Sequence, residues 1–214
     1  MQELKDAGFH TIFYSELVDF VENGTPLPDK PIIITFDDGY ASNYTYVYPI
    51  LQELNMKVEI ALIGGAIQYT SWGLKWTQVQ EMANSGLVSF QPHTDQMHSD
   101  NSDTGGRLGV LKLNTESWKH YVNTLDSDTA RILNRITTHV DQQPSIFTYP
   151  RGKWNMMSEA IAAKHGLKGS VTTKDGIATV TSGDPDSLWH MHRIGMDFLN
   201  GSVIQTLKQY GYRG

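Results

Sequence analysis

Short apolar runs alternate along the chain with segments in which apolar residues recur every three or four positions. The runs are rich in β-branched and aromatic residues, which favours buried strands, whereas the recurring positions are typical of amphipathic helices. We expect strands over residues 11–13, 32–36, 57–63, 88–90, 145–149 and 169–173. Strands that alternate with helices predict βα units and a mainly parallel sheet, so the fold class is α/β.

Capping residues and glycines predict where several helices begin and end. Ser15 is placed to cap a helix that stops at residues 23–24 (Asn-Gly), and residues 77–80 read as a capping box. Residues 126–128 (Asp-Ser-Asp) predict another N-cap, in front of an apolar stripe that runs to residue 140. We interpret the stripe as core, because an apolar stripe at helical spacing normally faces the interior.

The strand over 32–36 runs directly into two carboxylates and a glycine, Asp37, Asp38 and Gly39. The glycine lets the backbone turn sharply, and both aspartates must leave the apolar layer at the end of the strand. Two aspartates before a glycine are also a common turn signal. The motif alone therefore fits either acid chemistry at the mouth of a sheet or an ordinary turn.

A second strand, 88–90, leads to two histidines, His93 and His98. Their spacing of five does not place both rings on one face of a helix, so we expect a strand end followed by an irregular turn. Histidine pairs in loops are mostly solvated, but imidazole is also the commonest ligand for zinc. With Asp38 as a third ligand, the set suits zinc, cobalt, nickel or iron and leaves positions open for water and substrate.

Three ordered motifs resemble one known family. Residues 35–40 (Thr-Phe-Asp-Asp-Gly-Tyr), His93-Thr94 with His98, and residues 147–152 (Phe-Thr-Tyr-Pro-Arg-Gly) followed by Asn155 are similar to those of the polysaccharide deacetylases. These form carbohydrate esterase family 4, the NodB-homology domain. The longer-spaced second motif is similar to the poly-N-acetylglucosamine deacetylase branch. The resemblance covers about residue 5 to residue 200 and implies a distorted (β/α) barrel.

The resemblance implies a role for each motif. Asp38, His93 and His98 would bind one divalent metal ion, most simply zinc, and Asp37 would be the general base. A cation in such a site polarises an acetamide carbonyl and lowers the pKa of a water from near 16 to about 7. The backbone N–H of Arg151 would stabilise the developing oxyanion.

Two departures from the family pattern concern the base and the acid. The wider family often has an arginine two residues before Pro150 that tethers the base, and this chain has Thr148 there. The family's general acid is a histidine, for which His192 or His190 is the candidate here, although a strand-end histidine also serves structural hydrogen bonds. A residue that lies before the start of this chain is the remaining alternative for the acid.

Aromatic and neighbouring residues near the strand ends are candidates for sugar binding, because aromatic faces stack on pyranose rings. Aromatics at strand ends also commonly serve as packing. The candidates are Tyr40, Tyr149, Pro150, Trp154 and Trp72.

Length and charge limit the classes of partner. The 214 residues, 39% of them hydrophobic, predict a single domain over 1–214. A net charge of −6 offers no basic surface for nucleic acid, so a neutral or partly cationic polymer fits better. Without cysteine, any metal must be held by nitrogen and oxygen. We expect a monomer with no membrane-spanning segment.

Residues 1–8 resemble the family's first helix, which in related proteins follows a strand with a tyrosine-histidine pair. We therefore expect a chain truncated at its N-terminus, without the first barrel strand and without the export signal of a bacterial extracellular or envelope protein.

The leading hypothesis is a metal-dependent hydrolase that removes N-acetyl groups from N-acetylglucosamine units of an extracellular or cell-wall polysaccharide. Alternatives are an O-acetyl esterase acting on xylan through the same site, a catalytically silent carbohydrate-binding domain, and an unrelated (β/α) enzyme.

Overall fold

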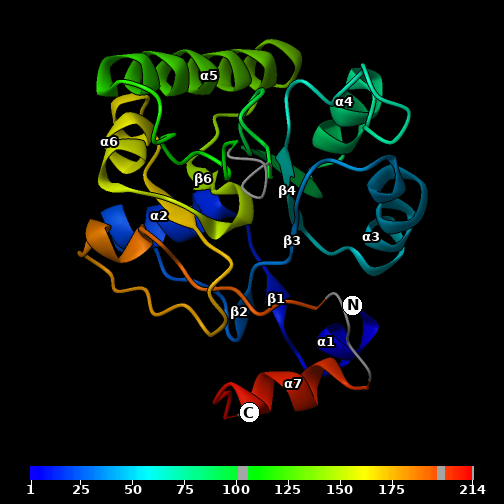
Figure 1. Cartoon of the computed structure of the whole chain (residues 1–214). Helices are drawn as coiled ribbons and strands as arrows, with labels where there is room; N and C mark the ends of the chain where they lie inside the picture. Colours follow the sequence, from blue (N-terminus) through cyan, green and yellow to red (C-terminus); the bar gives the residue numbers. More distant parts are fainter. Residues whose placement is uncertain (101–105, 197–200, 214) are drawn as a thin grey trace.

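The computed structural model describes residues 1–100, 106–196 and 201–213, and within them seven short strands form three small parallel sheets (Figure 1). The sheet orders are β1-β2, β3-β4-β5 and β6-β7. The strands are β1 (His10–Thr11), β2 (Pro31–Ile32), β3 (Thr35–Phe36), β4 (Val58–Leu62), β5 (Val88–Pro92), β6 (Ile146–Thr148) and β7 (Gly169–Val171). The helices are α1 (Gln2–Asp6), α2 (Tyr14–Asn23), α3 (Tyr48–Leu54), α4 (Trp76–Asn84), α5 (Trp118–His139), α6 (Met156–Lys164) and α7 (Val203–Gln209).

Every strand pair within the sheets is parallel, which confirms the predicted α/β class. In such sheets the carboxyl ends of neighbouring strands share one rim, where ligands commonly bind. The first motif begins in β3 and continues past its end, the second starts where β5 ends at Pro92, and the third leaves β6 after Thr148. The predicted strand over 32–36 is divided into β2 and β3, which belong to different sheets.

Side chains replace the missing backbone ladder between β5 and β6. The side-chain oxygen of Gln91 accepts the backbone N–H groups of Ser145 and Ile146, each at 3.0 Å. Gln142 accepts the N–H of Phe90 at 3.1 Å and donates to the carbonyl of Val88 at 3.0 Å. The polar groups of a buried strand need partners, so these two glutamines join the sheets without a continuous ladder.

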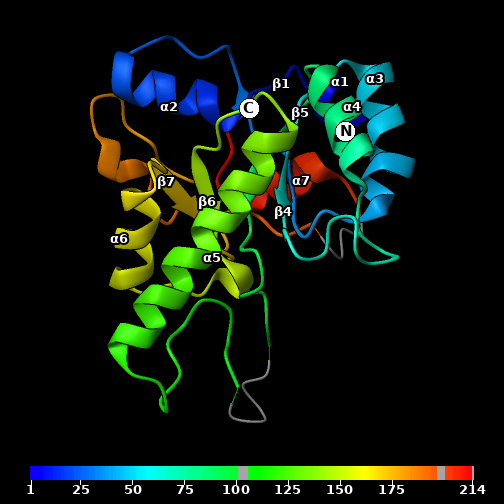
Figure 2. The same ribbon diagram turned by 90° about the horizontal axis from the view of Figure 1, so that it is seen from above.

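Helices cover the sheets through three apolar clusters. The largest packs α3, α4 and the C-terminal half of α5 against β4 and β5. A second joins α2 to β6 and β7, and a third lies between α5 and α6, which Figure 2 shows side by side. Near the chain ends, α7 lies beside α1, where Glu3 accepts the backbone N–H of Val203 at 2.8 Å.

Three predicted N-caps are wrong. Helix α2 begins at Tyr14, because the Glu16 carboxylate accepts the N–H of Phe13 at 2.8 Å, so Ser15 lies inside the helix. Likewise α4 begins at Trp76 and not within 77–80, since the Gln78 side chain accepts the N–H of Lys75. Residues 126–128 are internal to α5, whose cap is Ser117.

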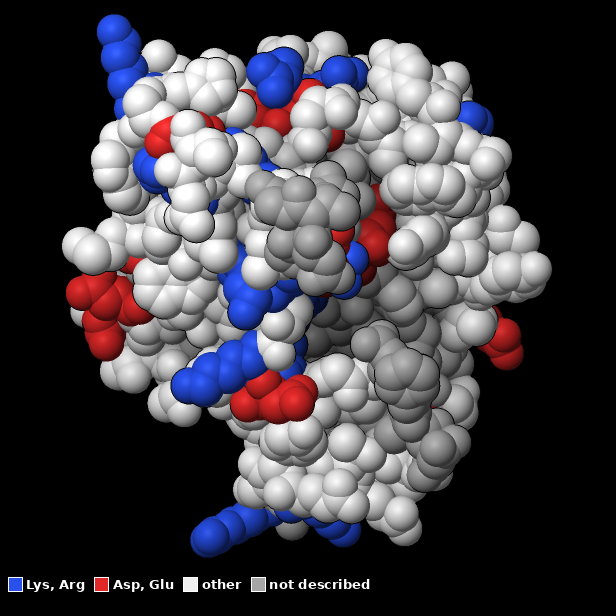
Figure 3. All heavy atoms as spheres, viewed as in Figure 1, with Lys and Arg blue, Asp and Glu red and all other residues white. Residues whose placement is uncertain are grey.

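None of the helices in the described ranges is long and apolar enough to cross a bilayer. Acidic and basic side chains are interspersed on the face seen in Figure 3, rather than separated into patches of one sign.

The buried carboxylate of Glu59 links three elements inside the fold. It accepts the N–H of Tyr14 at 2.6 Å and the side-chain amide of Gln91 at 3.0 Å, and the residue is 1% exposed. Burial raises the pKa of Glu59 to about 7, although these hydrogen bonds oppose the shift. The folded protein therefore binds this proton more tightly than the unfolded chain does.

We predict a pH dependence of stability from Glu59. Its contribution is fully present below the ordinary pKa of 4.5 and is lost as the pH rises through about 7. Chemical denaturation at pH 5 and pH 8 should give a larger fall in unfolding free energy for the wild type than for Glu59→Gln. The expected difference is about 1–3 kcal/mol. Exposed Glu53→Gln is the control, and an equal fall in all three proteins would contradict the prediction.

Candidate metal and hydrolytic site

Three predicted ligands converge at the rim. Nε2 of His93 lies 3.4 Å and Nε2 of His98 lies 3.3 Å from Oδ1 of Asp38. One donor atom from each residue lies within 4.8 Å of the others. His93 is 2% exposed, whereas the side chains of the other two are each 21% exposed. The cluster is therefore anchored on one side and open to solvent on the other.

Unusual backbone conformations turn these ligands toward one another. Asp38 and Gly39 both have φ of 72°, and Thr94 has φ of 71°. A Cβ at Gly39 would lie 2.7 Å from Leu62 Cδ2, so only glycine fits there. Positive φ is costly for a β-branched residue such as Thr94, and strain of this kind clusters at functional sites.

A hydrogen bond at Nδ1 of His93 determines that Nε2 is the ring nitrogen that faces the metal cluster. Its Nδ1 lies 2.7 Å from the carbonyl oxygen of Thr148, a distance at which Nδ1–H donates. Nε2 is then the nitrogen that faces Asp38 and that would bind a metal ion, the arrangement usual for a metal-binding histidine. Two imidazole nitrogens and one carboxylate oxygen fit a divalent cation such as zinc.

The carboxylate of Asp38 is ionised at neutral pH. Burial raises its pKa, but the two neighbouring histidines outweigh burial, and the pKa lies well below its ordinary value. The same negative charge raises the pKa of the Tyr40 hydroxyl.

Arg193 holds the neighbouring carboxylate, Asp37. Its two terminal nitrogens each donate to one Asp37 oxygen at 2.8 Å, and its Nε donates to the carbonyl of Thr172 at 3.0 Å. Burial raises the pKa of Asp37, but Arg193 and then His93 outweigh it, so the net pKa is lowered. An arginine thus tethers Asp37 even though position 148 is threonine.

Sequence reasoning missed this contact, because Arg193 lies outside the three motifs and 156 residues away from Asp37. The available signal was the charge itself. An arginine inside a strand-like segment that enters a protein interior needs a carboxylate partner.

The turn after β6 exposes one side chain of the third motif. Arg151 has φ of 58°, and its side chain is 53% exposed, with the guanidinium 3.3 Å from the Asp100 carboxylate. A Cβ on Gly152 would lie 2.5 Å from the backbone nitrogen of Thr173, so the turn packs tightly against the chain after β7. The Arg151 side chain thus lies at the surface, paired with Asp100.

The two candidate acid histidines have their described contacts outside the metal cluster. The His190 ring stacks on Trp154 with centroids 3.4 Å apart, and its Nε2 lies 3.0 Å from the Glu159 carboxylate. His192 packs against Gly176, where an added Cβ would lie 3.0 Å from its Nδ1. Among the described residues, no hydrogen bond or ion pair joins either ring to Asp37 or to the cluster.

The candidate sugar contacts fall into two groups. Tyr40, Trp72 and Trp154 are 37–45% exposed, and the rings of Tyr40 and Trp72 lie 5.1 Å apart. By contrast Tyr149 is 1% exposed and packs on Phe147, and Pro150 is also buried. In this structure neither residue offers an exposed side chain to a ligand.

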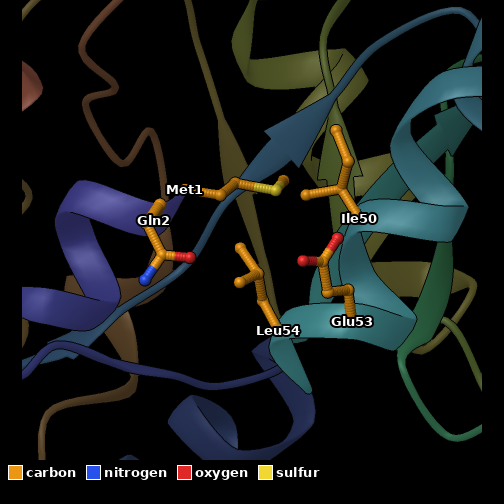
Figure 4. A pocket seen from close by; sticks show the side chains of 5 residues that line it. All are labelled: Met1, Gln2, Ile50, Glu53 and Leu54. Atoms are coloured by element: carbon orange, nitrogen blue, oxygen red, sulfur yellow. The ribbon is translucent and has the colours of Figure 1, made fainter.

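A cavity of about 360 Å³ lies between α1 and α3, where Met1, Gln2, Ile50, Glu53 and Leu54 line it (Figure 4). None of these residues belongs to the metal cluster or to the three motifs. This cavity therefore lies outside the candidate metal site.

Comparison with known proteins agrees with this geometry. The profile of the polysaccharide deacetylase family matches residues 24–170. Poly-beta-1,6-N-acetyl-D-glucosamine N-deacetylase of Escherichia coli (strain K12) is 27% identical over 205 residues, which cover 85% of this chain and 30% of that protein. The chain thus spans about a third of that relative's length. YxkH of Bacillus subtilis (strain 168), named as a polysaccharide deacetylase, is 29% identical, with 97% of this chain and 68% of YxkH covered.

A solved structure shares the fold. The de-N-acetylase from Aggregatibacter actinomycetemcomitans superimposes with a TM-score of 0.78 at 27% identity, over 98% of this chain and 86% of that one. The likeness confirms the predicted distorted (β/α) barrel.

We predict that Arg193→Gln raises the pKa of Asp37, because it removes the cation that favours the ionised carboxylate. Carbon-detected NMR titration of the Asp37 carboxyl group measures this directly. Arg107→Gln, which removes an ion pair with Glu116 instead, is the matched control. An unchanged Asp37 titration in Arg193→Gln would show that the tether has no electrostatic role.

Proposed function

The chain belongs to the polysaccharide deacetylase family, and from this membership we propose a metal-dependent hydrolase that removes N-acetyl groups from N-acetylglucosamine units of an extracellular or cell-wall polysaccharide. One observation carries the proposal: Asp38, His93 and His98 converge beside a carboxylate, Asp37, that an arginine holds in place. Relatives named as poly-N-acetylglucosamine deacetylases support the choice of polymer.

In this proposal Asp38, His93 and His98 hold one divalent cation, most simply zinc. A bound cation supplies Lewis acidity, which polarises an acetamide carbonyl and makes a water easier to deprotonate at neutral pH. The partly exposed Asp38 and His98 leave access for substrate, while buried His93 fixes the inner side of the site.

Asp37 would act as the general base. Because Arg193 and His93 lower its pKa, Asp37 is ionised and ready to accept a proton from the attacking water. The bidentate contact with Arg193 restricts its orientation, which favours one direction of proton transfer. The backbone N–H of Arg151 would stabilise the developing oxyanion, and Tyr40 and Trp154 would contact the sugar.

We propose His192 as the candidate acid for the leaving amine, since His190 is already occupied by Trp154 and Glu159. Among the described residues neither ring makes a hydrogen bond or ion pair with the cluster, which favours a second function, an O-acetyl esterase. An ester releases a better leaving group than an amide does, so it needs no strong acid.

The proposed polysaccharide substrate also indicates where the protein acts. We propose a monomer that acts outside the cytoplasm or at the cell envelope of a bacterium, where such polysaccharides lie. The named bacterial relatives support this location.

Acetate release tests the reaction. Metal-stripped protein should release acetate from N-acetylglucosamine oligomers only after one equivalent of zinc or cobalt is restored. Acetylated xylan is the matched substrate: release from xylan alone would favour the O-acetyl esterase. Stoichiometric metal binding without release from either substrate would identify a silent carbohydrate-binding domain and contradict the proposed activity.

Substitutions at the site can distinguish the role of the general base from that of the metal ligands. Asp37→Asn should lower kcat by at least about a hundredfold, the usual scale of general-base catalysis, and leave metal binding intact. His98→Ala should abolish both acetate release and metal binding, because it removes a metal ligand. Exposed Asp141→Asn is the control. Full activity of Asp37→Asn would exclude Asp37 as the base.

A further inference from the structure

The segment between His93 and His98 is held against α5 by four charged side chains, which we call the α5 clamp: Asp95, Asp128, Arg131 and Arg135. The carboxylate of Asp128 accepts the backbone N–H of Asp95 at 2.7 Å and that of Gln96 at 2.8 Å. Two consecutive amides of the ligand-bearing segment are thus bound to one side chain of the helix.

The two arginines balance the charge of this contact. Nε of Arg131 lies 3.0 Å and Nε of Arg135 lies 2.7 Å from the Asp95 oxygens. Asp95 and Asp128 are each 1% exposed, and buried carboxylates are stable only when they are paired and hydrogen-bonded. Positions 128, 131 and 135 share one face of α5, so the helix presents all three groups together.

The other side of the segment is equally confined. The N–H of Gly64 donates to the Thr94 carbonyl at 3.0 Å, and that of Gly65 donates to the Asp95 carbonyl at 2.8 Å. A Cβ on Gly64 would lie 2.4 Å from Oδ1 of Asp95. The segment therefore lies between the turn after β4 and α5, with no space in which to shift.

The two histidines depend on this arrangement to different degrees. His93 directly follows β5 and is fixed through its ring by the Thr148 carbonyl. For His98, the described residues provide one polar side-chain partner, Asp38. Its position therefore follows from the backbone fixed two residues earlier at Gln96.

We propose that the α5 clamp positions His98 and thereby sets the affinity of the site for its metal ion; this inference rests on the metal site proposed above. Residues that orient metal ligands typically change metal affinity by about 10–100-fold when they are mutated. Asp128 is the most informative member, because it binds the segment through backbone amides and touches no ligand side chain.

The test compares two identical substitutions on one helix. Asp128→Asn replaces one acceptor oxygen with an NH₂ group, so one of the two backbone N–H groups loses its acceptor. Asp126→Asn, the matched control, disturbs an ion pair with Lys164 on α6 instead. Titration of metal-free protein with Co²⁺, followed by visible absorption, should give a Kd raised about 10–100-fold for Asp128→Asn and nearly unchanged for Asp126→Asn.

Arg135→Gln keeps the test decisive if Asp128→Asn fails to fold, because this arginine is partly exposed. Its Kd for Co²⁺ should also rise, with thermal unfolding of the metal-free form as the measure of folding. If a folded clamp variant bound Co²⁺ with the wild-type Kd, the proposed role of the α5 clamp would be wrong, whereas the metal site would stand. A wild-type protein that binds no Co²⁺ would overturn the metal site and the clamp together.

Discussion

Negative charge that is wholly or partly removed from solvent is the constraint on which this site depends. Four carboxylates, Asp37, Asp38, Asp95 and Asp128, lie in or beneath one rim of the barrel, where an unpaired charge would be costly. The charge of each carboxylate is compensated by different neighbouring groups. Arginine 193 pairs with Asp37, two imidazoles face Asp38, and arginines of α5 or backbone amides satisfy the remaining two.

These compensations divide the site into separate parts. The cluster around Asp38 could hold a cation, whereas Arg193 fixes the orientation of the Asp37 carboxylate. Behind them, α5 fixes the segment between the two histidines. Asp37 and Asp38 are consecutive in the sequence, yet their carboxylates have different partners, an arginine for Asp37 and two histidines for Asp38.

The barrel positions these parts despite being incomplete as a hydrogen-bonded sheet. In the described residues its strands form three separate sheets, and the side chains of Gln91 and Gln142 satisfy the backbone where the ladder between β5 and β6 is missing. Parallel strands still bring their carboxyl ends to one rim, so residues far apart in the chain meet there. The largest apolar cluster lies on the β3-β4-β5 side, behind the strands that carry the first two motifs.

The sequence by itself determined the α/β class, most strand positions and the three motifs. The signals for these are local ones: hydrophobic periodicity, runs of β-branched residues and polar residues at strand ends. Helix starts were less certain, since Glu16 and Gln78 reach back to residues that are poor caps by type. Only the tertiary structure decided that Arg193 meets Asp37, 156 residues away, and that Asp128 binds the histidine segment instead of capping a helix. Contacts across the barrel depend on strand order and helix packing, which no local pattern encodes.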